Sequence, residues 1–374
     1  MASDGLPSER LDMASDGSPG ERSGIAAGRV EDGAAVEAIR AGDRGAFGDL
    51  AERHRRELQV HCYRMLGSYD ESEDLVQETF LHAWRRRETF EGRSTFRAWL
   101  YRIATNACLD FLERHPRAPR PYADPPTVGS VDAPRPQRLP WLQPFPDRLL
   151  GAVEPAAPGE SEPDAVVVEK ETIELAFLVA IQHLPPRQRA VLVLRDVLGW
   201  PALETAGALD LTVAAVKSAL QRARATVREH LPARRSEWAP GADPTAAERE
   251  LLRRYLGFME HRDVGALVDM FRADVRVTMP PHPIWFAGRE ELLARLAELY
   301  DPTSPYYIGE WSDVPTRANR QPAVAHYVRA PGDDVYRAQV LDVLHVEDGR
   351  IVAITAFMPH LFAAFGLPPT RSRR

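Results

Sequence analysis

Apolar residues recur every three or four positions through residues 34–115, the spacing that places them on one face of a helix. Three such stripes can be traced, and their members are Leu50, Leu58 and Met65; Val76, Phe80 and Trp84; and Phe96, Trp99, Leu100, Ile103, Ala107 and Phe111. The pattern stops at Pro116 and Pro119, because proline cannot continue a helix. Residues 34–115 are therefore predicted to form a helical bundle.

A second helical pattern covers residues 164–235. Its first stripe consists of Ile173, Phe177, Ile181 and Leu184. A short helix at 201–208, a turn and a helix capped by Thr212 are expected to follow. The inner face of that last helix is predicted to be Val216, Ala219, Leu220, Ala223 and Val227. A short helix, a tight turn and a longer helix form a helix-turn-helix.

The segments outside these bundles have other compositions. Residues 116–163 hold 13 of the 32 prolines and are predicted to be a linker without regular helix or sheet. Within it Trp141 and Phe145 are expected to pack against a neighbouring domain, because a solvated spacer has little use for such apolar bulk. Residues 1–33 are predicted to be a disordered tail, and 363–374 a basic tail.

From residue 244 to residue 362 the pattern changes to two helices followed by alternating strands. Residues 335–346 and 351–357 flank the sequence Glu-Asp-Gly-Arg at 347–350, which is typical of a hairpin turn. This part is predicted to be an α+β domain, joined to the helical part by a short connector at 236–243. Asp342 shares a strand face with Val340 and Leu344, so a buried carboxylate is expected there.

Charge is distributed unevenly along the chain. The formal net charge is −7, yet residues 212–235 hold six Lys or Arg against one acid. Four side chains spaced by four, three and four positions form one stripe on the predicted last helix, with Ser218 and Arg222 beside it; they are Lys217, Gln221, Arg224 and Arg228. Such a helix suits DNA, with basic groups on phosphates and with Gln221 and Arg222 reaching base edges.

The remaining composition limits the function classes. Cys62 and Cys108 have no partner at metal-ligand spacing, so we expect buried free thiols, a reducing compartment, no metal and no cofactor. No apolar run approaches the ~18 residues that cross a membrane. The chain is expected to be cytoplasmic.

The segments DLVQETFLHAWRR at 74–86 and FRAWLYRIATN at 96–106 resemble region 2 of bacterial sigma factors of the extracytoplasmic-function (ECF) group. The resemblance implies that the acidic helix docks on the β′ clamp helices of RNA polymerase, with Asp74, Gln77, Glu78 and Trp84 as the contacting residues. It also implies that the following loop and helix hold a base flipped from the −10 element. The residues implied are Phe90, Gly92, Arg93, Arg97 and Asn106.

The basic helix resembles sigma region 4, which reads the −35 promoter element and lies at the β flap of the polymerase. The residues implied to contact DNA are Thr212, Lys217, Ser218, Gln221, Arg222, Arg224 and Arg228. Ala219 and Thr205 depart from the family, which often has Arg and an aliphatic residue there; the number of DNA contacts depends on these positions.

Residues 251–271, 279–289 and 321–326 resemble the SnoaL-like fold, a cone-shaped α+β barrel that can enclose a small ligand. The candidate pocket residues are His282, Trp285, His326 and Asp342. We expect a regulatory or binding domain with no catalytic residues, since spacing alone demonstrates no acid–base pair.

The predicted fold is therefore two all-α sigma domains, a region 2 bundle and a region 4 helix-turn-helix, followed by the SnoaL-like barrel. The predicted function is that of an ECF sigma factor, not an enzyme, which binds core RNA polymerase and promoter DNA and is tuned by its C-terminal domain. Two alternatives remain: a helix-turn-helix regulator that acts without polymerase, and a SnoaL-type enzyme with a DNA-binding appendage.

Overall fold

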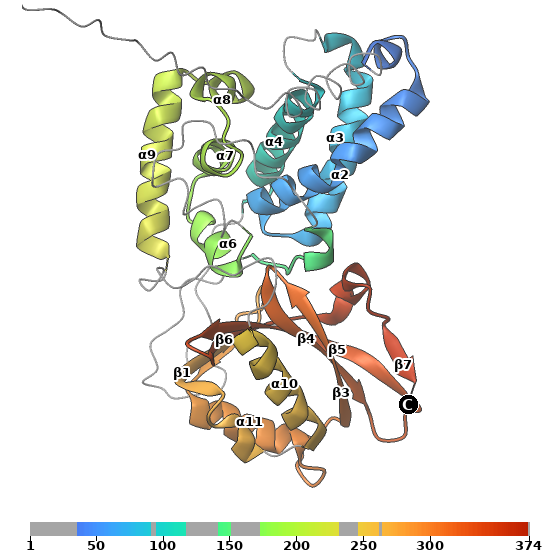
Figure 1. The fold of residues 1–374 in the computed structure, drawn as a ribbon, viewed down its shortest axis with the longest axis vertical. Helices are drawn as coiled ribbons and strands as arrows, with labels where there is room; N and C mark the ends of the chain where they lie inside the picture. The colour runs from blue at the N-terminus through green and yellow to red at the C-terminus, as the bar shows by residue number, and fades with distance from the viewer. Residues whose placement is uncertain are drawn as a thin grey trace, which may run out of the picture.

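The computed structural model describes residues 36–90, 95–116, 141–150, 173–231, 246–261 and 264–372. A helical half, built from the first part of the chain, stands on a strand-rich half built from the last part (Figure 1). The predicted fold class, helical domains followed by an α+β domain, is confirmed. None of the described helices is both long and apolar enough to cross a bilayer.

The first bundle consists of α2 (Arg44–Leu66), α3 (Tyr69–Arg85), the short η1 (Arg87–Thr89) and α4 (Phe96–Arg114). Asp43 caps α2 by accepting hydrogen bonds from the backbone N–H groups of Gly45 and Ala46, and Thr95 caps α4 in the same way. The apolar stripes meet in the middle of the bundle, where Leu58, Met65 and Leu100 have no exposed surface.

The second bundle consists of α6 (Leu175–Ile181), α7 (Pro186–Leu192), a π-helical turn at Val193–Val197, α8 (Ala202–Leu209) and α9 (Val213–His230). The hydroxyl of Thr212 accepts a hydrogen bond from the N–H of Ala215 at 3.1 Å, which confirms the predicted cap. The predicted inner face of α9 is also confirmed, because all five of its members are buried. Asp210 supports the turn between α8 and α9 with a left-handed backbone at φ 52°.

The two bundles pack directly on each other, with α4 against α7 and α8. Arg189 of α7 is buried between them and donates hydrogen bonds to the carbonyls of Met65 at 2.5 Å and Ile181 at 3.1 Å. Elsewhere in the same interface, the buried rings of Tyr101 and Trp200 lie 6.0 Å apart. One buried Arg that satisfies carbonyls from both bundles fixes their relative orientation.

The C-terminal domain opens with α10 (Ala246–His261) and η4 (Val264–Leu267) and contains one seven-stranded sheet and α11 (Arg289–Tyr300). The strands are β1 (Phe271–Thr278), β2 (Trp285–Ala287), β3 (Glu310–Ala318), β4 (Gln321–Arg329), β5 (Val335–Glu347), β6 (Arg350–Phe357) and β7 (Thr370–Ser372). Their order is β2-β1-β6-β5-β4-β3, with β7 paired to β5, and only the β1–β6 pair is parallel. The predicted hairpin turn joins β5 to β6, with positive φ at Asp348 and Gly349.

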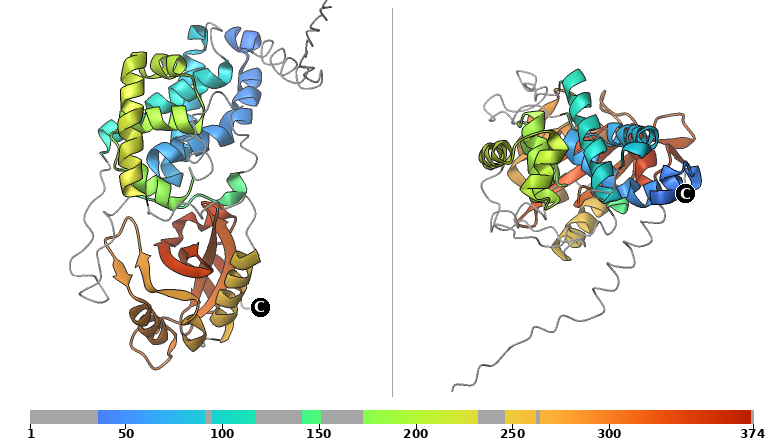
Figure 2. Two further views of the ribbon diagram at one scale, coloured as in Figure 1. Left: turned by 60° about the vertical axis from the view of Figure 1, so that its left-hand side comes forward. Right: turned by 90° about the horizontal axis from the view of Figure 1, so that it is seen from above.

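The sheet separates two cores. Val324 and Leu344 point to the face that α10 and α11 cover, where they join the smaller apolar cluster. Ala325 and Tyr327 point the other way and belong to the same cluster as the helical half, together with η5 (Pro359–Phe365). Figures 1 and 2 show the helical half meeting the sheet at the end where β3 turns into β4. The two halves of the molecule therefore share a continuous apolar core.

Candidate nucleic-acid and polymerase interfaces

The outward face of α9 is open to solvent. Figure 1 places α9 at the edge of the molecule, with α7 and α8 between it and the first bundle. Six of the seven predicted DNA-contacting residues lie on this exposed face: Thr212, Lys217, Ser218, Gln221, Arg222 and Arg228. The guanidinium of Arg222 donates to the hydroxyl of Ser218 at 2.6 Å, which orients both toward the same surface.

Arg224 differs from its neighbours on α9. Its guanidinium donates two hydrogen bonds, from Nε at 2.8 Å and from Nη2 at 2.9 Å, to the two carboxylate oxygens of Asp196. Only 20% of the Arg224 side chain and 3% of the Asp196 side chain are exposed. The prediction that Arg224 belongs to the open DNA-facing stripe is therefore wrong for this conformation, because a buried carboxylate holds its side chain.

An exposed stripe also runs along α3. Asp74 and Gln77 are exposed, and Glu78 is half-exposed and lies 3.7 Å from His82. Leu81, which follows at the next helical step, is 56% exposed. The sequence reasoning missed Leu81, although its spacing from Asp74, Gln77 and Glu78 on one face would have found it. An apolar side chain ringed by acidic and polar groups is typical of a protein-binding surface.

Trp84, the fourth predicted polymerase-binding residue, is only partly exposed. Its ring lies 5.3 Å from that of Phe47, and the guanidinium carbons of Arg44 and Arg87 lie 5.8 and 4.6 Å from it. Trp84 therefore anchors α3 to α2 more than it faces outward.

The predicted −10 residues differ in their surroundings. Gly92 and Arg93 lie outside the described residues. Phe90 is only 6% exposed, and its ring packs against Phe96 at 5.9 Å and Trp99 at 5.2 Å. The prediction that Phe90 stacks on a flipped base is wrong for this conformation, because the ring is part of the bundle core. A position beside a loop does not reveal which way an aromatic ring turns.

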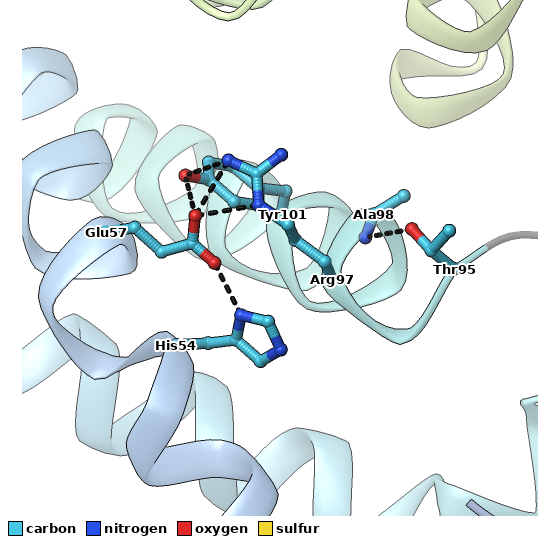
Figure 3. A network of polar contacts seen from close by, with 6 residues as sticks. All are labelled: His54, Glu57, Thr95, Arg97, Ala98 and Tyr101. Carbon is cyan, nitrogen blue, oxygen red and sulfur yellow. Dashed lines mark hydrogen bonds and ion pairs between the residues drawn. The ribbon is translucent and has the colours of Figure 1, made fainter. Parts of the chain in front are cut away.

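A polar network links Arg97 to α2 (Figure 3). Arg97 donates from Nε to Glu57 at 2.7 Å, and the hydroxyl of Tyr101 donates to the same carboxylate at 3.2 Å. His54 lies 2.5 Å from the other Glu57 oxygen. Burial alone would raise the pKa of Glu57, but the hydrogen bond with His54 and the charge of Arg97 outweigh it, so this pKa lies below its ordinary value. Asn106, farther along α4, is half-buried.

The described part of the linker, residues 141–150, is built into the interior. Phe145 has no exposed surface, and its ring lies 4.7 Å from Tyr63 and 5.6 Å from Tyr69. Trp141 is half-buried; its backbone N–H donates to the amide oxygen of Gln182 at 3.0 Å, and its carbonyl accepts from the same amide at 2.7 Å. The linker thus bonds to both helical bundles.

Asn319, in the tight turn between β3 and β4, joins the C-terminal domain to this linker. It is fully buried and has a left-handed backbone at φ 54°. Its carboxamide oxygen accepts from the N–H of Phe145 at 2.8 Å, and its amide nitrogen donates to the hydroxyl of Tyr63 at 2.8 Å and the carbonyl of Ile173 at 2.6 Å. One side chain therefore bonds to the first bundle, the linker and the start of the second bundle. We call the contact of Asn319 with Tyr63, Phe145 and Ile173 the three-way joint.

An ion pair supports the three-way joint from the same turn. Asp147 of the linker accepts a hydrogen bond from the guanidinium of Arg317 at 3.0 Å and another from the backbone N–H of Arg320 at 2.7 Å. Neither of these contacts was visible in the sequence, because a short β-turn carries no sign of what it will touch.

The interior of the C-terminal domain holds a charged triad. His326 is buried, with Nδ1 2.5 Å from Asp313 and Nε2 3.2 Å from Asp342. Burial opposes the charged imidazolium, but the two carboxylates dominate and raise the pKa of His326 to about 10. The other oxygen of Asp342, Oδ1, is buried and has no hydrogen-bond partner among the described residues. Two of the four predicted pocket residues thus meet, together with Asp313, which the sequence reasoning missed.

The other two predicted pocket residues are not part of this triad. His282 is exposed in the loop between β1 and β2, so its prediction as a pocket residue is wrong. Trp285 is buried at 1% exposure, at the start of β2. Cys62 and Cys108 are buried free thiols, as predicted. The described part of the chain contains no cluster of His, Cys, Asp or Glu that fits a metal ion.

Comparisons with known proteins match the three parts of the chain. The family models for Sigma-70 region 2, Sigma-70 region 4 and the SnoaL-like domain match residues 50–118, 174–227 and 252–354. The ECF RNA polymerase sigma factor SigG of Mycobacterium tuberculosis is 40% identical over 332 residues, covering 87% of this chain and 85% of its own. The chain belongs to the ECF family of RNA polymerase sigma factors.

Other relatives agree with this ECF assignment. SigW of Bacillus subtilis is 29% identical over 198 residues, which covers 52% of this chain and 94% of SigW. The crystal structure of the ECF sigma factor SigJ of Mycobacterium tuberculosis shares the fold, with a TM-score of 0.52 and 23% identity over 85% of this chain and 98% of SigJ.

Membership in the ECF family has three consequences. The first bundle is region 2, the second is region 4, and the segment at 141–150 lies in the linker between them. Sigma factors are not enzymes, and a SnoaL-like fold is not by itself a sign of catalysis. The alternatives of a polymerase-independent regulator and of a SnoaL-type enzyme are therefore set aside.

Proposed function

We propose that this sigma factor binds core RNA polymerase through the exposed stripe of α3, which docks on the β′ clamp helices. The stripe consists of Asp74, Gln77, Glu78 and Leu81, whose exposure and charge fit a basic partner surface with an apolar contact at the C-terminal end of the stripe. Region 4 in turn lies at the β flap and reads the −35 duplex with the outward face of α9. Region 2 captures the −10 strand at the N-terminal end of α4.

The C-terminal domain regulates these steps by holding regions 2 and 4 together. The single observation that carries this proposal is Asn319, which is fully buried and bonds to both regions and to the linker. Separating the regions would break these hydrogen bonds, each of which contributes about 0.5–1.5 kcal/mol net to the closed form. We call the arrangement in which region 2 packs on region 4 the closed arrangement. The C-terminal domain therefore acts as a clamp that stabilises it.

Clamping favours inhibition, with a residual positive role. In the closed arrangement α4 packs on α7 and α8, and Arg102 of α4 lies 3.8 Å from Asp210 of region 4. A promoter strand that approaches α4 must displace region 4 from this side. The positive role lies in keeping the two DNA-binding regions folded and close together until polymerase engages them.

A small ligand bound inside the C-terminal domain would regulate this clamp. The triad of Asp313, His326 and Asp342 leaves one negative charge in excess when the imidazole is protonated. The same β3–β4 hairpin carries Asp313 and His326 on its strands and Asn319 at its tip. A ligand that binds the triad differently in the clamped and released states would shift the balance between them.

Transcription in vitro with core polymerase tests the clamp. The proteins to compare are the full chain, a 1–243 truncation, Asn319→Ala, and the matched control Gln339→Ala, which removes an exposed amide from β5. We expect Asn319→Ala and the truncation to transcribe differently from the full chain, in the same direction, and Gln339→Ala to match the full chain. Equal activity for all four proteins would refute regulation by the clamp.

A further inference from the structure

The pair of Asp196 and Arg224 connects two parts of region 4 that the sequence keeps 28 positions apart. Arg224 lies on α9, one helical step from the exposed Gln221 and Arg228. Asp196 lies on the π-helical turn that continues α7. Both oxygens of its carboxylate are engaged by the one guanidinium, at 2.8 and 2.9 Å. A two-point contact between planar groups fixes orientation as well as distance.

The π-helical turn explains why the carboxylate faces inward. The N–H of Leu198 bonds to the carbonyl of Val193, five residues back, so this turn is wider than an α-helical turn. Asp196 ends up only 3% exposed, directed at α9. Single π-helical turns inside helices occur frequently at functional sites.

A buried carboxylate needs compensation, and the position of α9 provides it. A charge removed from water is costly unless it is paired with good geometry. The Arg224 guanidinium meets this need only if α9 keeps its present rotation about its own axis. That same rotation directs Gln221 and Arg222 outward on the neighbouring face.

We propose that Asp196 and Arg224 are positioning residues for promoter recognition: the buried pair sets the rotation of α9 and thereby aims Gln221 and Arg222 at base edges of the −35 duplex. Arg224 thus contributes to sequence recognition by holding α9 in place through its contact with Asp196, and it does not itself contact a phosphate. The inference rests on the proposed reading of the −35 duplex by α9 and adds what fixes the orientation of that helix.

The experiment measures the affinity of the full chain for two duplexes by fluorescence anisotropy over a range of salt concentrations. One duplex is the sequence that the wild-type chain selects from a randomised pool, and the other is a scrambled version of equal composition. The ratio of the two affinities reports sequence reading. The slope of log affinity against log salt counts phosphate contacts.

Asp196→Asn removes a negative charge from a site that DNA cannot reach, and Arg224→Lys keeps the positive charge but loses the two-point fork. We expect both variants to lower the affinity ratio about tenfold and to leave the salt slope unchanged. The control Lys217→Ala should weaken both duplexes alike and reduce the slope by about one unit. Wild-type affinity ratios for Asp196→Asn and Arg224→Lys would overturn the proposal.

The double variant Asp196→Asn with Arg224→Lys separates positioning from independent roles. Because the two groups act as one unit, its loss of affinity ratio should not exceed the larger single loss. Additive losses would overturn the proposal. Circular dichroism melting is recorded for every variant. If Asp196→Asn does not fold, Arg224→Lys decides alone: an affinity ratio lowered at an unchanged melting temperature supports positioning, and a ratio that stays at the wild-type value refutes it.

Discussion

The two helices that we propose bind the promoter are presented in opposite ways. On α9, which lies at the edge of the molecule (Figure 1), the base-reading candidates Gln221 and Arg222 are exposed. On α4 the −10 candidates Arg97 and Asn106 are half-buried, and the helix packs against region 4. The closed arrangement therefore leaves the proposed −35 surface of α9 exposed and partly covers the proposed −10 surface of α4. Duplex recognition and strand capture are expected to respond differently to opening.

The largest expected effect is the loss of stability on replacing Phe90, next to the partly covered helix α4. Its ring is buried against Phe96 and Trp99, so Phe90→Ala should lower the free energy of unfolding by about 3–5 kcal/mol. The matched change on the open side, Gln221→Ala, should alter stability by less than about 0.5 kcal/mol. Urea unfolding measures both. A wild-type stability for Phe90→Ala would mean that the ring is free to stack on a base after all.

The acidic stripe of α3 should act on polymerase and not on the fold. Asp74→Arg combined with Glu78→Arg reverses two surface charges, so we expect core polymerase binding to weaken by about tenfold or more while thermal melting changes little. The control is Glu113→Arg, a charge reversal on the exposed surface of α4. Polymerase retention at the wild-type level would place the docking surface elsewhere.

The exposed residues of α9 should fall into two groups, those that contact bases and those that contact phosphates. Gln221→Ala and Arg222→Ala should each cost about 1–3 kcal/mol at one −35 position and relax the preference there. Lys217→Ala should instead weaken all duplexes alike. Affinity measurements on a set of single-base promoter variants separate the two behaviours. Uniform losses for all three variants would show that this helix contacts only the backbone.

The smallest expected effect is a pH dependence in region 2. The pKa of Glu57 is lowered in the folded state. Its contacts with Arg97 and His54 therefore stabilise region 2 at pH values above the ordinary carboxyl pKa. That contribution is lost as the pH falls through the lowered value. Glu57→Gln should therefore flatten the acid side of the stability profile, as followed by urea titrations at a series of pH values. An unchanged profile would mean that the network contributes nothing to stability.

The sequence predicts the open helix well and the covered one poorly, for a physical reason. Helical period and local charge are enough to assign the inner and outer faces of α9, because both depend on neighbours in sequence. The partner of Arg224 is 28 positions away on a π-helical turn, and no local pattern reports it. Phe90 beside its loop poses the same problem, since tertiary packing decides which way its ring turns.

The contacts made by the C-terminal domain depend even more on tertiary structure. His326 and Asp342 were both named as candidate pocket residues, but alternation orders side chains only within one strand, so their meeting depends on the pairing of β4 with β5. Asp313 required the register of the β3–β4 hairpin, which pairs it with His326. Asn319 in the sequence looks like an ordinary turn residue, and only the docking of three segments reveals its partners.

The most direct test of the clamp is the distance between regions 2 and 4 measured by single-molecule fluorescence energy transfer. Labels fit at cysteines introduced for Glu113 on α4 and Glu229 on α9, both exposed, because Cys62 and Cys108 are buried. The account predicts one narrow population for the full chain and an additional, broader population for Asn319→Ala. A broad distribution already present in the full chain and identical in Asn319→Ala would contradict it.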